Sequence, residues 1–117
     1  MRVWDLPPKV LCRNHLLGEH AEIHAVWSVI TRRKKGYRCH PEVNRWRGKL
    51  KALYQRHQKT AKELKKRSYQ HQSPLQMSLA KGAFRQEVLI DSLADQKKIL
   101  KDKKCGCFLL PKVIRSF

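Results

Sequence analysis

Residues 9–31, KVLCRNHLLGEHAEIHAVWSVIT, decide the fold class of this chain. At the helical spacing of about 100° per residue, the apolar side chains of this segment form one stripe. The members of the stripe are Cys12, Leu16, Ile23, Trp27 and Ile30. Pro7 and Pro8 precede the segment and hold the first residues extended. We therefore expect an amphipathic helix over residues 9–31, after an extended N-terminal arm over residues 1–6.

Two further segments have apolar residues at helical spacing. The first runs from Pro41 to about Arg67 and includes Gly48, which we expect at a close approach between helices. The second covers residues 79–103. No segment alternates with the period of a strand, and 117 residues accommodate one core. We predict an all-α fold, a compact single-domain bundle of three main helices spanning residues 1–117, with a helical core over 8–104 and a tail over 105–117.

The charge of the chain points to a polyanionic partner. There are 27 Lys and Arg against 9 Asp and Glu, a formal net charge of +18. Such a charge repels itself unless a polyanion is bound, and nucleic acid is the leading candidate. No apolar run approaches the roughly 20 residues of a spanning helix, so we expect no membrane partner. The first residues lack a signal-peptide pattern, so we expect a cytoplasmic, nucleoid-associated protein with reduced cysteines.

The basic residues concentrate between Arg32 and Arg67, where their density favours contacts with DNA phosphates over a solvated surface. We also assign one histidine and two arginines near the start of the chain to this DNA surface. The residues predicted to bind DNA are Arg2, Arg13, His15, Arg32, Arg33, Lys34, Lys35, Arg38, Arg45, Arg47, Lys49, Lys51 and Arg56.

One polar edge of the first helix carries the candidate chemistry. His15, Glu19 and Glu22 stand at i, i+4 and i+7, within about 60° of one another around the axis. Such a trio is usually a solvated helix face. Here, two carboxylates lie on a surface expected to meet DNA, where negative charge weakens binding. A local function for these carboxylates explains their presence.

A metal site is not expected from the residue pattern. His20 and His24 have the i, i+4 spacing of metal ligands, but HLLGEHAEIH is not the H-E-x-x-H pattern. The cysteines form no C-x-x-C pair, and we expect Cys105 and Cys107 to be packing residues or a crosslink. We predict neither a metal nor a cofactor.

The segments MRVWDLPP, HLLGEHAEIH and GYRCHPEVNRWRGKLKALYQRH, followed by a basic helix end and SPL, occur in this order. Together they resemble the pyrimidine-dimer DNA glycosylase/AP lyases of the phage endonuclease V type, over about residues 1–75. The resemblance implies a monomeric all-α enzyme that binds damaged double-stranded DNA without a metal. Such enzymes flip a base out, cleave the glycosidic bond and then the strand. Trp4 and Tyr37 are candidates for stacking on the base, although each is more often an anchor of the core or a loop.

The resemblance assigns the family's catalytic residues by position. Its N-terminal nucleophile falls on Met1, which we expect to be retained before the bulky Arg2, and its catalytic glutamate falls on Glu22. The family's helix-one arginines, which grip distorted DNA, fall on Ala21 and Ala25. This departure bears on the expected pyrimidine-dimer substrate more than on the expected reaction. The aromatic end of the phage type is reduced to Phe108 and Phe117.

An N-terminal amine suits this reaction. Its pKa is ordinarily about 7.7–8.0, so about a tenth is unprotonated near pH 7, against well under a thousandth of a lysine. Glu22 is then expected to stabilise the charge that develops on the sugar and to move protons, with Glu19 in support. The alternatives are a non-catalytic basic nucleic-acid-binding protein and, more remotely, a His/Cys metal nuclease.

Overall fold

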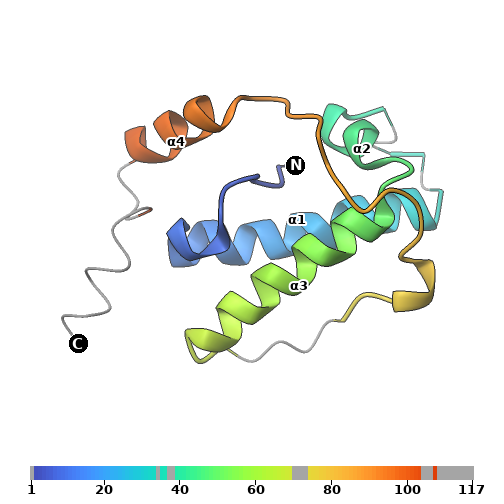
Figure 1. Ribbon diagram of the computed structural model, residues 1–117, viewed down its shortest axis with the longest axis horizontal. Helices are drawn as coiled ribbons and strands as arrows, with labels where there is room; N and C mark the ends of the chain where they lie inside the picture. The colour runs from blue at the N-terminus through green and yellow to red at the C-terminus, as the bar shows by residue number, and fades with distance from the viewer. Residues whose placement is uncertain (1, 34, 37–38, 70–73, 104–106, 108–117) are drawn as a thin grey trace.

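In the computed structural model, the described residues are 2–33, 35–36, 39–69, 74–103 and 107. The elements, in chain order, are η1 (Pro8–Val10), α1 (Arg13–Thr31), α2 (Pro41–Trp46), α3 (Leu50–Lys66), η2 (Met77–Leu79) and α4 (Leu93–Asp102) (Figure 1). Outside the helices, the described part of the chain forms a single isolated β-bridge, between Lys49 and Gly82, and no strand. The predicted all-α fold class is confirmed.

Two helices form the centre of the molecule. α1 and α3 pack against each other, and the short α2 contacts both of them. The N-terminal arm, residues 2–7, runs along α1 and lies between α1 and α4 in Figure 1. A hydrogen bond of 2.9 Å from the backbone N–H of Asp5 to Oε1 of Gln96 joins the arm to α4. The arm is therefore packed into the bundle and does not hang from it.

The predicted second helix is divided into two. α2 ends at Trp46 and α3 begins at Leu50, and Gly48 between them has φ +73°, in the left-handed region that favours glycine. The expected close approach of another helix at Gly48 is wrong, because a side chain there would meet nothing within 4 Å and the glycine is needed for its backbone angle. It is the extended segment around Gly82 that approaches the carbonyl of Gly48. A side chain on Gly82 would overlap that carbonyl, so only glycine fits at position 82.

The predicted third helix is shorter than expected. Helix α4 covers only Leu93–Asp102, and Ser92 caps it by accepting a hydrogen bond from Asp95 N–H at 3.1 Å. The preceding residues cap α3 instead. The backbone N–H groups of Lys51 and Ala52 each donate to a carbonyl of this segment, Lys81 and Ala83, at 3.1 Å. These N–H groups have no partner within α3, which explains why the segment is extended.

The first helix also differs slightly from its prediction. It begins at Arg13, because residues 8–10 form the separate turn η1. Four members of the predicted apolar stripe are buried, as expected, and the fifth, Ile30, is half-buried.

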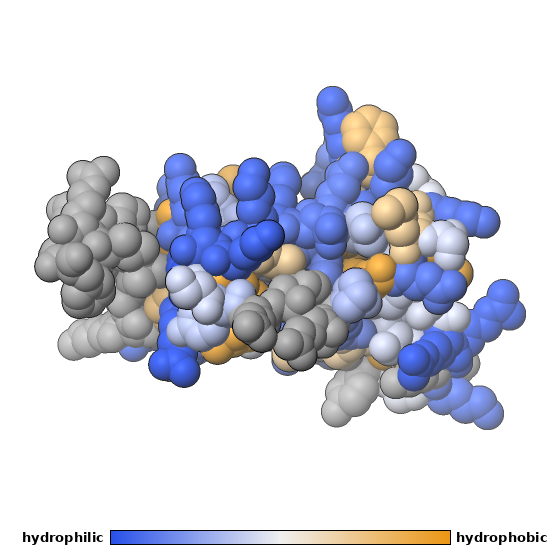
Figure 2. Space-filling view, turned by 90° about the horizontal axis from the view of Figure 1, so that it is seen from below, coloured by the Kyte–Doolittle hydropathy of each residue, from blue (hydrophilic) through white to orange (hydrophobic). Residues whose placement is uncertain are grey.

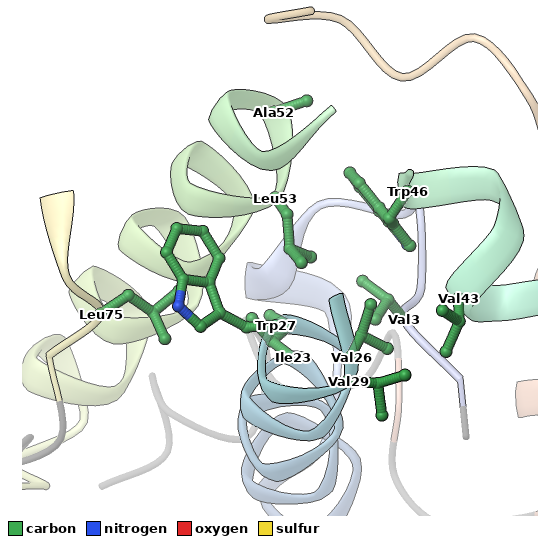
Figure 3. Packing of buried hydrophobic residues seen from close by; sticks show 10 residues of the cluster. All are labelled: Val3, Ile23, Val26, Trp27, Val29, Val43, Trp46, Ala52, Leu53 and Leu75. Carbon is green, nitrogen blue, oxygen red and sulfur yellow. The ribbon is translucent and has the colours of Figure 1, made fainter. Parts of the chain in front are cut away.

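The arm contributes to both hydrophobic clusters of the core. Val3 packs among Val26, Val43 and Trp46 in the first cluster (Figure 3). The second cluster combines residues of the arm with residues from η1 to the end of the described chain. Its buried members are Trp4, Leu6, Leu11, Cys12, Leu16, Leu64, Leu100 and Cys107. The predicted extended arm is therefore a structural element of the core.

Arg45 is an interior residue, with 6% of its surface exposed. Its guanidinium donates to Glu42 Oε1 at 2.8 Å, to Asp5 Oδ1 at 2.9 Å and to the carbonyls of Val3 and Val88 at 2.7 and 2.9 Å. One side chain thus ties α2 to the arm and to the segment before α4. The predicted phosphate contact of Arg45 is wrong, because these partners occupy its donors.

Replacing Arg45 with Met tests this role. The change leaves the carboxylates of Glu42 and Asp5 inside the protein without their cation, so we expect a loss of about 3–5 kcal/mol in the free energy of unfolding. Urea denaturation followed by tryptophan fluorescence measures the loss. Arg47→Ala removes an exposed arginine two residues away and is expected to change stability by no more than about 0.5 kcal/mol. Equal effects of the two changes would contradict the assignment.

Candidate active site

A cavity of about 370 Å³ lies where the arm, α1 and α4 meet. It is lined by residues from each of these three parts of the chain. They are Arg2 and Trp4 from the arm, Asn14, His15, Gly18, Glu19 and Glu22 from α1, and Ile99 and Lys103 from α4 and its C-cap. The polar edge predicted on the first helix thus forms one wall of this cavity, with all three of its members.

Glu19 anchors the arm from below the cavity. It is 2% exposed, and its Oε1 accepts a hydrogen bond from the backbone N–H of Trp4 at 2.9 Å. Arg56 of α3 donates to both carboxylate oxygens of Glu19, each at 2.8 Å, and to the carbonyl of Leu6 at 2.7 Å. The Glu19–Arg56 pair therefore fixes the backbone of the arm at two residues. Arg56 is removed from the predicted phosphate contacts, because its guanidinium serves this structural role.

The two carboxylates on this wall have different environments. Burial raises the pKa of Glu19, while the charge and hydrogen bonds of Arg56 and the Trp4 N–H act in the opposite direction. Glu22, one turn further along α1, is only half-buried and lines the cavity without belonging to this buried pair. Glu19 is thus built into the scaffold, and Glu22 is the carboxylate that a bound molecule can reach.

Arg2 brings the start of the chain to the same cavity. Its guanidinium forms an ion pair with Asp91 at 2.8 Å and lies 4.7 Å above the ring of Trp4. The predicted nucleophile, Met1, lies outside the described residues. Its neighbour Arg2 lines the cavity that contains Glu22.

Trp4 is an anchor of the arm. It is 6% exposed, belongs to the second hydrophobic cluster and meets the ring of His15 edge to face at a centroid distance of 5.8 Å. Of the two roles considered for Trp4, this position supports the anchor and leaves little of the ring for stacking on a base. Tyr37, the other candidate, lies outside the described residues.

His15 combines a place on the cavity with two sulfur contacts. Its Nδ1 lies 3.1 Å from Sγ of Cys12 and 3.5 Å from Sγ of Cys107. Burial, together with the positive charge of Lys103, lowers the pKa of His15, which favours the neutral imidazole at pH 7.

Several of the residues predicted to contact DNA are exposed. Arg13, Arg32, Arg33, Lys35, Arg47 and Lys51 belong to this group. Lys49 is half-buried, and its Nζ donates to Oε1 of Gln86 at 2.8 Å. Lys34 and Arg38 lie outside the described residues. On the part of the face in Figure 2 that is not grey, hydrophilic residues predominate and hydrophobic residues occur in small separate areas.

Sequence reasoning missed a buried polar pair that supports the cavity. Gln96, 2% exposed in α4, donates from Nε2 to Asp5 Oδ2 at 3.0 Å and accepts from Asp5 N–H. An aspartate between two apolar residues, Trp4 and Leu6, was the available signal, because such a residue is buried only with a partner. Its partner, 91 residues away, has no signal of its own.

The different roles of the two glutamates can be separated by replacing each with glutamine. Glu19→Gln leaves Arg56 without its buried counter-charge, so we expect a loss of about 3 kcal/mol in the free energy of unfolding and faster hydrogen exchange at the amide of Trp4. Glu22→Gln is expected to change the stability by no more than about 0.5 kcal/mol and to leave exchange in the arm unchanged. Denaturation and hydrogen-exchange mass spectrometry measure both. Faster exchange of the arm in Glu22→Gln alone would reverse the assignment.

Comparison with known proteins identifies the family. A family model described as pyrimidine dimer DNA glycosylase matches residues 1–77. The matched part contains the arm, α1, α2 and α3. It also contains Glu19, Arg56, Arg45 and the hydrogen-bond partners described above for them, with the exception of Val88. Neither the comparison with curated proteins nor that with solved structures gives a match. No helix in the described part of the chain has the length and apolar character needed to cross a membrane. The chain belongs to the pyrimidine dimer DNA glycosylase family.

Proposed function

We propose that this protein is a DNA glycosylase and AP lyase that attacks damaged duplex DNA with its N-terminal amine. The observation that carries the proposal is the cavity shared by Glu22 and Arg2. Membership in the glycosylase family supplies the class of substrate. A net charge of +18 supports binding to the phosphate backbone.

The position of Arg2 supports the amine as the nucleophile. The proposal takes Met1 to be retained. Adjacent Cα atoms are about 3.8 Å apart, so the residue that carries this amine is joined directly to a residue of the cavity wall. The backbone of the arm is held at four residues. The carbonyls of Val3 and Leu6 accept hydrogen bonds from Arg45 and Arg56. The N–H groups of Trp4 and Asp5 donate to Glu19 and Gln96. A fixed arm reduces the entropy lost when the amine and the sugar are brought together.

The proposed reaction has two stages. In the first, the unprotonated amine forms a bond to C1′ of the sugar as the bond from C1′ to the base breaks, and the departing base takes up one of the two amine protons. The carboxylate of Glu22 stabilises the positive charge on the sugar. Ring opening then gives an imine between the protein nitrogen and C1′, with the amine proton passing to the ring oxygen. In the second stage, a proton leaves C2′ and the 3′ phosphate departs by β-elimination, and Glu22 is the base that lies at the site. Water finally releases the imine.

The range of lesions is part of the proposal. Ala21 is exposed and Ala25 half-buried on α1, at the positions where the resemblance places DNA-gripping arginines. We propose that abasic sites are cleaved. Pyrimidine dimers are the base lesion to test first, because the family model is described by them. We expect cleavage at dimers to be weaker than at abasic sites, because fewer cations on α1 weaken the hold on bent DNA.

Borohydride trapping on a duplex with one abasic site tests the chemistry. Reduction of the imine is expected to link the protein to DNA, and chemical blocking of the N-terminal amine is expected to abolish both the link and strand cleavage. Glu22→Gln is expected to slow cleavage on the order of 10²–10⁴-fold.

The matched control is Glu87→Gln, which neutralises an exposed carboxylate away from the cavity. We expect the rate of this variant to equal that of the original protein. Cleavage that persists with a blocked amine and with Glu22→Gln would reject the proposal. Salt-sensitive binding without any product would identify the protein as a non-catalytic binder of nucleic acid.

Phosphate contacts are tested with Arg47→Ala, the variant that leaves the fold intact. Each lost phosphate contact is expected to make the slope of log affinity against log salt concentration less steep by about 0.9. Fluorescence anisotropy with a labelled duplex measures this slope. Affinity that is unchanged at every salt concentration would remove Arg47 from the DNA surface.

A further inference from the structure

A second group of reactive side chains lies behind the cavity. Cys12 is the N-cap of α1, His15 is in the first turn of this helix, and Cys107 follows α4. One possible ligand atom of each residue lies within 4.8 Å of the other two. These atoms are Sγ of each cysteine and a ring nitrogen of His15. The fold thus brings together two thiols and an imidazole from segments 95 residues apart.

The distances agree with tetrahedral zinc. Zinc–sulfur bonds of about 2.3 Å and zinc–nitrogen bonds of about 2.0 Å place the sulfur and nitrogen ligands about 3.5 Å apart. The two sulfurs are 3.1 and 3.5 Å from Nδ1 of His15. A ring nitrogen carries either one proton or one lone pair, so Nδ1 alone cannot bond both sulfurs well. A cation at their centre satisfies all three atoms.

The surroundings favour a bound cation. Cys12 and Cys107 are 5% and 6% exposed within the second hydrophobic cluster. Two thiolates neutralise a divalent ion, so the complex carries no net charge into this interior. The backbone N–H of Cys12 donates to Sγ of Cys107 at 3.0 Å, an outer contact of the kind that supports a ligating sulfur.

We propose that Cys12, His15 and Cys107 bind a structural zinc ion that fastens the chain after α4 to the start of α1. Binding releases the two thiol protons. A water molecule or a further side chain completes the tetrahedron. The ion holds His15, and through it one wall of the cavity, in place. It takes no part in the attack on C1′, so the proposal stands independently of the glycosylase mechanism.

The other candidate cluster is explained without a metal. His20, His24 and His57 also bring ligand atoms within 4.8 Å of one another. Nε2 of His57 lies 3.2 Å from Nε2 of His24, and Nδ1 of His57 lies 2.9 Å from Oε1 of Gln58. Since the amide oxygen can only accept, Nδ1 of His57 carries the proton and its Nε2 accepts from His24. This chain of hydrogen bonds accounts for both distances at His57. The group also contains no cysteine, and a thiolate binds zinc more strongly than an imidazole does.

The test is the metal content of the full-length protein purified under reducing conditions without a chelator. We expect about one zinc ion per chain, measured by inductively coupled plasma mass spectrometry. After exchange, cobalt is expected to show a thiolate-to-cobalt charge-transfer band. Cys12→Ser and Cys107→Ser are expected to lose the zinc. Cys39→Ser, an exposed cysteine outside the group, is expected to retain it, as is His24→Gln.

Three results would overturn the proposal: no zinc above background, a disulfide between Cys12 and Cys107 in the freshly purified protein, or loss of zinc from His24→Gln in place of the cysteine variants. If a serine variant fails to fold, the cobalt spectrum of the unchanged protein decides, because the charge-transfer band requires a thiolate ligand. Glu22→Gln is expected to keep its zinc. Loss of trapping with zinc retained would reject only the glycosylase mechanism, and trapping without zinc would reject only the metal site.

Discussion

The buried pair between Glu19 and Arg56 is the interaction on which the rest of the structure depends. It joins α1 to α3, the two central helices, and its atoms also bond the backbone of the arm at Trp4 and Leu6. A buried ion pair gives stability only when its remaining donors and acceptors are satisfied, and here the arm supplies these partners. The start of the chain is therefore fixed because the interior charges need it.

This requirement explains how a very basic chain uses its few acidic residues. Glu19, Glu42 and Asp5 neutralise arginines in the interior, where an unpaired guanidinium would be most costly. The exposed cations are left for the proposed contacts with DNA phosphates. Glu22 is the acidic residue of the cavity wall that is outside these buried pairs, which is why a role in the reaction suits it better than a role in the fold. The proposed zinc ion would attach the chain after α4 to the start of α1, at the end of the cavity wall that carries His15.

Much of the fold could be predicted because the spacing of apolar residues along a helix reflects which side chains are buried. The stripe from Cys12 to Trp27 identified the first helix and its inner face, and the polar edge of His15, Glu19 and Glu22 was found by the same rule. Periodicity does not distinguish a helix from an extended segment that caps one, so residues 80–92 were assigned to the third helix. Charge was equally ambiguous. Arg45 and Arg56 look like their exposed neighbours, and only the position of Asp5 and Glu19 in three dimensions shows that they are interior. The contact of Cys107 with Cys12 also depends on the fold and not on local spacing.

The central claim is that the fixed arm delivers the N-terminal nitrogen to the sugar beside Glu22. The most direct measurement is peptide mapping of the borohydride-reduced adduct by tandem mass spectrometry. The account predicts the sugar on the α-nitrogen of Met1. Lys103 is the lysine among the described residues that line the cavity, and its side-chain amine is the rival nucleophile. A sugar attached to Nζ of Lys103, or to any other lysine, would contradict the account.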